Sequence, residues 1–220
     1  MRHLFGGGLD PSGQLWGDFG SVRLGRGSGF SEREHVASEL QRRKVTGVVR
    51  AMDANGDGFL EEMDFTQLTA RWAEIRGAAP GSDEYGRLSS VMMGWWHTLL
   101  GASGEPPVDK ITLDDVLTVV DELGRMRDAV AATADIMFDV IDEDRDGRIS
   151  AAEYKQLIEA WNGRATDTDD IFPLLDLDGD GHLSHGEFRE LWTEFWAGDN
   201  ADSPGTWVFG RFPLPTMQDH

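Results

Sequence analysis

Three short stretches that repeat one arrangement of acidic residues and glycine constrain this chain more than any other feature. In each stretch an oxygen-bearing side chain recurs at every second position, and a glycine follows the third. Carboxylates this close together repel one another unless a cation lies among them. A single stretch could be a polar turn, but three with the same downstream spacing indicate a repeated cation site. The stretches are Asp53-Ala-Asn55-Gly-Asp57-Gly58, Asp142-Glu-Asp144-Arg-Asp146-Gly147 and Asp176-Leu-Asp178-Gly-Asp180-Gly181.

The downstream spacing fits a twelve-residue calcium loop. Such a loop takes ligands from positions 1, 3 and 5, the backbone carbonyl at 7, often a water-linked group at 9, and a bidentate Glu at 12, with glycine at 6 for a sharp turn. In the second stretch the ligands fall on Asp142, Asp144, Asp146, the Arg148 carbonyl, Ser150 through water, and Glu153. In the third they fall on Asp176, Asp178, Asp180, the His182 carbonyl, Ser184 through water, and Glu187.

The first stretch departs from this template at its last position. Its ligands fall on Asp53, Asn55, Asp57, the Phe59 carbonyl, Glu61 and Asp64. Asp64 is one methylene shorter than Glu, so a bidentate grip on the ion requires the following helix to move closer. We therefore expect weaker discrimination in favour of Ca²⁺, or appreciable Mg²⁺ occupancy, at this loop. Direct binding by Glu61 is a compensation that the sequence leaves open.

Apolar residues at helical spacing lie before and after each loop, which predicts helix–loop–helix units with aromatic stripes forming the core. Each loop also has an apolar residue at position 8, where paired loops form a short antiparallel bridge. Pro173 predicts that the helix entering the third loop starts late, near Thr168, or kinks. The residues at position 8 are Leu60, Ile149 and Leu183.

Because such units pair, the first loop needs a partner between residues 80 and 125. Apolar spacing predicts one helix over Leu88–Leu99 and a second over Val116–Leu123. With Ile111 at position 8, a pseudo-loop runs between them from Gly104 to Asp115. We interpret this unit as a structural one that has lost its metal, because positions 1, 3 and 5 offer no side-chain oxygen. Those positions are Gly104, Pro106 and Val108.

The three loops are identified as EF-hands, and a chain with sites one, three and four intact and the second degenerate resembles the calerythrin and sarcoplasmic calcium-binding protein family. The calcium-triggered photoproteins share that layout. The tail Asp202-Ser-Pro-Gly205-Thr-Trp207-Val-Phe209 is similar to the end of bacterial calerythrin-type proteins. The resemblance implies an all-α fold of four EF-hand units in two paired lobes that form one compact body. It also implies a calcium buffer or transport protein rather than an activator of targets.

The pattern divides the chain into four parts. Residues 1–34 are rich in glycine, and we expect a disordered extension that is either without function or an arm that binds a partner. Residues 35–125 are predicted to form the first EF-hand pair and residues 126–198 the second. Residues 199–220 form a tail whose aromatic side chains either dock into the protein's own groove or belong to an ordinary packed terminus.

Composition excludes several classes of function. Forty acidic residues against 20 Lys and Arg give a formal net charge of −20, which disfavours binding to nucleic acids and to anionic membranes. The chain has no cysteine, which excludes disulfides, thiolate zinc sites and cysteine nucleophiles. No apolar run approaches the roughly 18 residues of a membrane span, and residues 1–30 lack the apolar core of a secretory signal. We expect a cytoplasmic monomer.

The preferred interpretation is a non-enzymatic calcium buffer with three functional sites. The eight methionines of the chain are not clustered into the flexible patches with which sensors bind varied targets, which favours a buffer. One alternative is a calcium sensor that exposes a groove to an unknown protein partner. A more remote alternative is a photoprotein-like enzyme, suggested by His97 beside Trp95 and Trp96, although the six histidines show no catalytic spacing. Calcium affinities, their order of filling and any protein target are left open.

Overall fold

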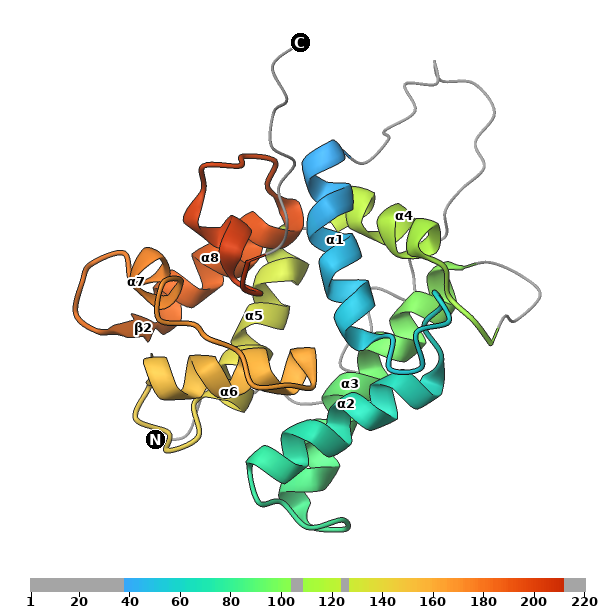
Figure 1. Cartoon of the computed structure of the whole chain (residues 1–220), viewed down its shortest axis with the longest axis horizontal. Helices are drawn as coiled ribbons and strands as arrows, with labels where there is room; N and C mark the ends of the chain where they lie inside the picture. The colour runs from blue at the N-terminus through green and yellow to red at the C-terminus, as the bar shows by residue number, and fades with distance from the viewer. Residues whose placement is uncertain (1–37, 104–108, 124–126, 212–220) are drawn as a thin grey trace, which may run out of the picture.

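The computed structural model describes residues 38–103, 109–123 and 127–211, and its helices follow the order of four helix–loop–helix units (Figure 1). The predicted extension over residues 1–34, positions 1 to 5 of the pseudo-loop (104–108) and the last part of the predicted tail (212–220) lie outside the described residues. Two short strands, Arg148–Ser150 (β1) and His182–Ser184 (β2), lie in the loops of the last two units. The helices are α1 (Glu39–Met52), α2 (Glu62–Ile75), α3 (Asp83–Ala102), α4 (Leu113–Leu123), α5 (Arg127–Ile141), α6 (Ala151–Asn162), α7 (Phe172–Leu175), α8 (His185–Ala197) and the 3-10 helix η2 (Pro204–Trp207).

The loops pair in the predicted manner. Leu60 and Ile111 exchange two backbone hydrogen bonds of 2.9 and 2.8 Å, which joins the first loop to the described part of the pseudo-loop. Ile149 faces Leu183 in the antiparallel pair of β1 and β2. All four residues are almost completely buried. The predicted pairing of Ile111 with Leu60 of the first loop is therefore confirmed.

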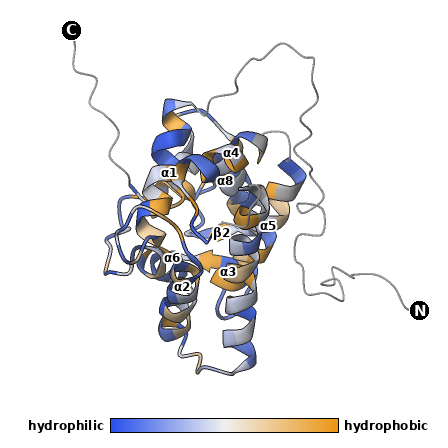
Figure 2. Ribbon diagram, turned by 90° about the vertical axis from the view of Figure 1, so that its right-hand side faces the viewer, coloured by the Kyte–Doolittle hydropathy of each residue, from blue (hydrophilic) through white to orange (hydrophobic). Residues whose placement is uncertain are grey.

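The four units form one compact body with a continuous core. Figure 1 shows the first two units on one side and the last two on the other. Within the halves, α2 packs on α3 and α5 packs on α8; between them, α1 and α2 contact α6, and α4 contacts α8. The labelled helices carry both hydrophobic and hydrophilic residues (Figure 2), and in α1 the buried residues recur at helical spacing, so that one face of the helix is buried. The predicted all-α architecture of paired EF-hand units is confirmed.

Serine and glycine mark several helix boundaries. Ser38 begins α1 by accepting a hydrogen bond from the Gln41 amide, and the Gln41 side chain returns to the Ser38 amide in a capping box. Helix α6 ends at Gly163, whose φ of 64° lies in the left-handed region that glycine adopts without strain. These local signals place the helices around each loop.

Helix α7 is shorter than the sequence predicts. A regular helix begins only at Phe172, four residues after Thr168. The Thr168 carbonyl nevertheless accepts the amide N–H groups of Ile171 and Phe172, so a turn anchored on Thr168 precedes the helix. Pro173 has no N–H to donate and fits the first turn of a helix, which explains why the regular helix starts where it does.

Two buried cations join the halves of the molecule. The Lys44 ammonium on α1 donates to the carbonyl oxygens of Phe195 at 2.6 Å and Gly198 at 2.8 Å. The Arg76 guanidinium at the end of α2 donates to the carbonyls of Val140 and Ile141. Both cations meet the last carbonyls of a helix, which have no partner within that helix and carry partial negative charge.

The segment after α8 folds back onto the core. Val208 is completely buried, and the Phe209 ring lies 4.8 Å from Trp161 and 4.7 Å from Phe195 between ring centroids. Phe209, in the described part of the tail, therefore packs against the protein's own helices α6 and α8. In the described part of the chain, no helix combines the length and the apolar content required to cross a membrane.

Candidate metal centres

The first loop (53–64), the second loop (142–153) and the third loop (176–187) share one internal hydrogen-bond network. In each, the aspartate at position 1 accepts the N–H of the glycine at position 6, at 2.9, 3.0 and 2.8 Å respectively. The oxygen at position 3 accepts the N–H of position 5 at 2.9 to 3.1 Å. The carboxylate at position 5 accepts the N–H of position 7 at 2.8 to 3.0 Å. Backbone donors thus turn the three side chains toward the inside of each loop.

Glycine at position 6 is required by the backbone. Its φ is 83° to 87° in all three loops, a conformation that L-residues with a Cβ rarely adopt. Position 4 is also left-handed, with glycine in the first and third loops. In the second loop that position is Arg145, with φ of 61°, the sole non-glycine with positive φ among the described residues.

The carboxylate at position 12 closes each loop. The two carboxylate oxygens of Glu153 accept the amide N–H of Glu143 at 2.7 Å and of Ser150 at 2.8 Å. Glu187 makes the equivalent pair of bonds in the third loop, at 2.9 and 2.8 Å. Partial burial raises the pKa of Glu153, but these amide hydrogen bonds outweigh it and hold that pKa below its usual value, so the side chain is kept anionic.

Asp64 spans the same two amides although it is shorter. Its oxygens accept the N–H of Ala54 at 3.0 Å and of Glu61 at 2.8 Å, and the residue is completely buried. The first loop therefore reproduces the network of the other two, with its last carboxylate held one methylene closer to the helix backbone.

The same residues also start the exiting helices. Ser150 is the N-cap of α6, and its hydroxyl pairs with Glu153 in a capping box; Ser184 and Glu187 do the same for α8. A loop position 9 and position 12 are three residues apart, which is the spacing of a capping box. The helix start and the predicted metal ligands are thus specified together by the local sequence.

Two groups of carboxylates have the arrangement that a hard divalent cation needs. One oxygen from each of Asp142, Asp144 and Asp146 lies within 4.8 Å of the others, and the same holds for Asp176, Asp178 and Glu187. Within the described residues the first loop forms no such group of three acidic side chains, and its position 3 carries the amide of Asn55. Calcium accepts six to eight oxygen ligands in a flexible cage, which fits this donor set.

One residue at the first loop was missed by the sequence analysis. The Lys110 ammonium lies 2.9 Å from the Asp57 carboxylate and 2.5 Å from the Glu61 carboxylate. The hydrogen bond that Lys110 donates to Asp57 is the largest cause that lowers the pKa of Asp57. Lys110 occupies position 7 of the pseudo-loop, and in an antiparallel pair position 7 faces position 9 of the partner, so the alignment contained a signal for it.

A separate apolar cavity of about 120 Å³ lies where the two halves meet. Four tryptophans line it together with Thr98 and Thr133. The Thr98 hydroxyl donates to the Gly94 carbonyl at 2.9 Å, while the Thr133 hydroxyl accepts the Trp192 indole N–H at 2.7 Å. Both hydroxyls are therefore engaged within the protein. The lining tryptophans are Trp95, Trp161, Trp192 and Trp196.

Sequence comparison matches each loop separately. The family model described as EF hand matches residues 50–69, 134–158 and 168–192. A relative from Oryza sativa subsp. japonica, named probable calcium-binding protein CML17, is 25% identical over 145 residues, covering 66% of this chain and 87% of that protein.

Solved structures of similar fold include two calcium-related proteins. The calcium-loaded apo form of the coelenterazine-binding protein from Renilla muelleri has a TM-score of 0.61 at 22% identity, covering 80% of this chain and 99% of that one. A sarcoplasmic calcium-binding protein from amphioxus has a TM-score of 0.59 at 15% identity, again covering 80% and 99%. At these identities the likeness concerns the fold.

Proposed function

This chain belongs to the EF-hand calcium-binding proteins, and on that premise we propose that it is a calcium buffer or transport protein with three functional sites. The observation that carries the proposal is the hydrogen-bond network common to all three loops. Because backbone amides already orient the carboxylates, little ordering remains when an ion binds. Loops ordered in this way are suited to holding the ion, and the apolar surface that Val208 and Phe209 cover favours a buffer over a sensor.

The proposed ligands are those that the loop template assigns. Carboxylate and amide side chains supply positions 1, 3, 5 and 12, and backbone carbonyls supply position 7. The bound ion would contribute a divalent charge to each loop and would take its remaining ligands from water or from position 9. The proposed set is Asp53, Asn55, Asp57, Phe59, Glu61 and Asp64; Asp142, Asp144, Asp146, Arg148 and Glu153; and Asp176, Asp178, Asp180, His182 and Glu187.

The covered apolar surface supports a buffer over a sensor. Val208 and Phe209 fill the space beside α6 and α8 that a target helix would need. The large apolar side chains that are exposed in the described part of the chain are few and come from four different segments. They are Phe59, Met63, Ile75, Leu174 and Leu177. This surface also supports a monomer, and we retain the cytoplasmic location expected from the sequence.

The cavity chemistry supports a role without catalysis. His97 is exposed and does not line the cavity, although Trp95 does. The described cavity lining includes no acidic, basic or histidine side chain that could transfer a proton, although the buried indole N–H groups of Trp161 and Trp196 have no hydrogen-bond partner. Mixing the calcium-free protein with coelenterazine, oxygen and calcium should give no light, whereas emission would establish the photoprotein alternative.

Calorimetric titration of calcium into the ion-free protein tests the proposal. We expect three ions per chain, and Glu153→Gln should remove one of them because it replaces a bidentate anionic ligand with a neutral amide. Glu159→Gln, on the same helix outside the loop, serves as the control and should keep all three. Recovery of fewer than three ions by the unaltered chain would overturn the three-site proposal.

A further inference from the structure

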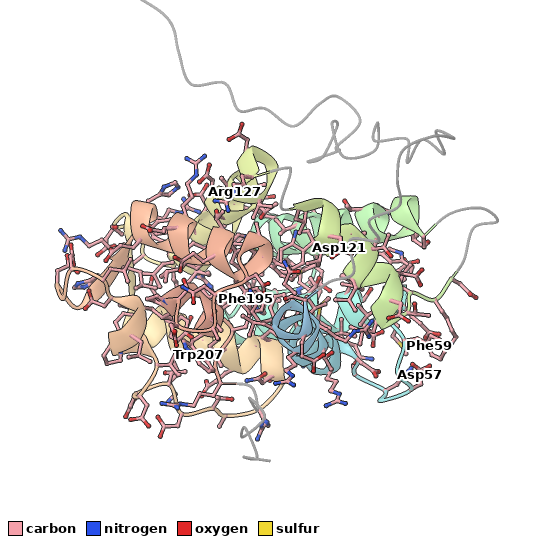
Figure 3. All side chains as sticks on the ribbon, turned by 90° about the horizontal axis from the view of Figure 1, so that it is seen from above. Asp57, Phe59, Asp121, Arg127, Phe195 and Trp207 are labelled. Carbon is pink, nitrogen blue, oxygen red and sulfur yellow. The ribbon has the colours of Figure 1, made fainter. Side chains whose placement is uncertain are left out.

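The pseudo-loop contributes a fixed positive charge to the neighbouring calcium loop. Lys110 lies next to Ile111, whose bridge with Leu60 holds the two loops side by side. The Lys110 ammonium is 2.9 Å from the carboxylate of Asp57 at position 5 and 2.5 Å from that of Glu61 at position 9. It also lies 5.1 Å from the centre of the Phe59 ring, an additional favourable contact for a cation. Figure 3 shows Asp57 and Phe59 at the end of the molecule away from Phe195 and Trp207.

The paired loops of the other half differ in this respect. Arg148, at the equivalent position 7, approaches Asp180 only to 3.6 Å, and both side chains are about half exposed. There the cation contacts a single carboxylate. In the first loop one ammonium binds two carboxylates at shorter distances. No other lysine plays this part at a loop. The chain has three lysines, and of the other two Lys44 is buried and Lys155 lies on the surface of α6.

We infer that Lys110 is a tethered competitor of the divalent ion: it neutralises part of the negative charge of the first loop and makes that loop the weakest of the three sites. The inference rests on the proposed function, since it concerns the affinity of one of the proposed sites. A divalent ion bound to Asp57 meets the ammonium a few ångströms away, and like charges at that distance repel even in water. The unit without ligands of its own thereby regulates the unit with which it pairs.

The effect of Lys110 differs from that of Asp64. Lys110 competes through its charge and its hydrogen bond to Asp57, neither of which depends on the size of the ion, so it weakens Ca²⁺ and Mg²⁺ binding by similar factors. Asp64 acts through the length of its side chain, which changes the ratio of Ca²⁺ affinity to Mg²⁺ affinity. Measuring both ions at the first loop therefore separates the two residues.

The experiment is a titration of Lys110→Met with Ca²⁺ and with Mg²⁺, followed by the amide signals of Gly58, Gly147 and Gly181 in a heteronuclear spectrum. Each glycine reports one loop. We expect the affinity of the first loop for both ions to rise about tenfold, which corresponds to about 1.4 kcal/mol, with the other loops unchanged. The gain should shrink at high salt, because the pair is exposed.

Two variants serve as controls. Lys110→Arg keeps the charge and should keep the affinity close to that of the unaltered chain. Lys155→Met removes the same charge from a lysine that has no ion pair in the described part of the chain, and should leave the first loop unchanged. Circular dichroism of each variant confirms that it is folded.

An unchanged or lower affinity at Gly58 in folded Lys110→Met would overturn the inference, and so would absence of binding at the first loop in both the unaltered chain and the variant. Binding that appears only in the variant would support it. Failure of the proposed function is distinguishable, because it would show as absent responses at Gly147 and Gly181, which Lys110 does not contact.

Discussion

Single residues determine how closely each loop follows the calcium template. Glu153 and Glu187 have the length for a bidentate grip, while Asp64 occupies the same position with one methylene less and is fully buried. The structure adds that Asp64 makes the same two amide hydrogen bonds as the glutamates. Reduced selectivity for Ca²⁺ over Mg²⁺ at the first loop therefore remains a prediction. It depends on the shorter side chain of Asp64, because the carboxylate is oriented like those of the two glutamates.

Asp64→Glu should restore selectivity for calcium at the first loop. The longer side chain lets both oxygens reach an ion without movement of α2, which favours the larger coordination number of Ca²⁺ over the octahedron of Mg²⁺. We expect the ratio of Ca²⁺ to Mg²⁺ affinity at Gly58 to rise about tenfold. Competition titrations monitored by that amide signal provide the measurement, with Gly147 as the internal reference. A constant ratio would show that Asp64 does not limit selectivity.

Elements outside the loops determine which apolar surface is covered. The segment from Pro204 to Gly210 packs on α8, and Gly205 lies so close to that helix that a Cβ atom would overlap the Leu191 carbonyl oxygen. The Gly205 amide also donates to the Glu194 carboxylate at 2.9 Å. Glycine at this position permits the close approach of the two backbones.

Gly205→Ala should displace the segment from α8. The added methyl group meets the helix backbone, which cannot move away without disturbing the core. We expect the free energy of unfolding to fall by about 3 kcal/mol, comparable to the loss of one large core side chain, and binding of an apolar dye to increase. Denaturant unfolding and dye fluorescence provide the measurements.

Gly86→Ala is the matched control for that substitution. Gly86 lies within α3, and a Cβ built there meets no atom within 4 Å other than the adjacent residues and the backbone of its own helix. Since alanine favours a helix over glycine by about 1 kcal/mol, this variant should be as stable as the unaltered protein or more so. If Gly205→Ala behaved like the control, the segment would not be held by close packing.

At the scale of the whole molecule, buried polar contacts join the halves that the two EF-hand pairs form. Lys44 is the clearest of these, because its ammonium from α1 binds the carbonyls at the end of α8 and is almost completely buried. Burial is the main cause that lowers the pKa of Lys44 from 10.5 to about 8, against the opposing charges of Asp199 and Glu194.

This pKa predicts how the stability of the molecule depends on pH. Between about pH 8 and 10.5 the unfolded chain keeps the Lys44 proton while the folded chain releases it, so stability rises with pH. From pH 7.5 to 9.5 the rise amounts to about 2 kcal/mol. Well below pH 8 both states hold the proton, and Lys44 contributes no dependence.

Urea unfolding of the ion-free protein across this range provides the test, and Lys44→Met should abolish the rise. The upper limit of pH 9.5 avoids tyrosine ionisation, because burial raises the pKa of Tyr154 and makes stability fall again above pH 10. A rise of equal size in Lys44→Met would assign it to another group.

The sequence by itself determined where the loops lie, their pairing through position 8 and the all-α fold, and it predicts the ligands. It could do so because the ligands of one loop lie within twelve residues and the flanking helices follow a short repeat of apolar residues. Ile111, for example, was placed from spacing alone.

Only the tertiary structure decided what distant segments do to one another. Lys110 is 53 residues from Asp57 along the chain, and Lys44 is 154 from Gly198, yet both pairs are in hydrogen-bond contact. The packing of Phe209 on Trp161 and the cavity between the halves are of the same kind. Such contacts depend on the orientation of whole helices, which results from the packing of the entire core, whereas a loop's ligand spacing is a property of its own few residues.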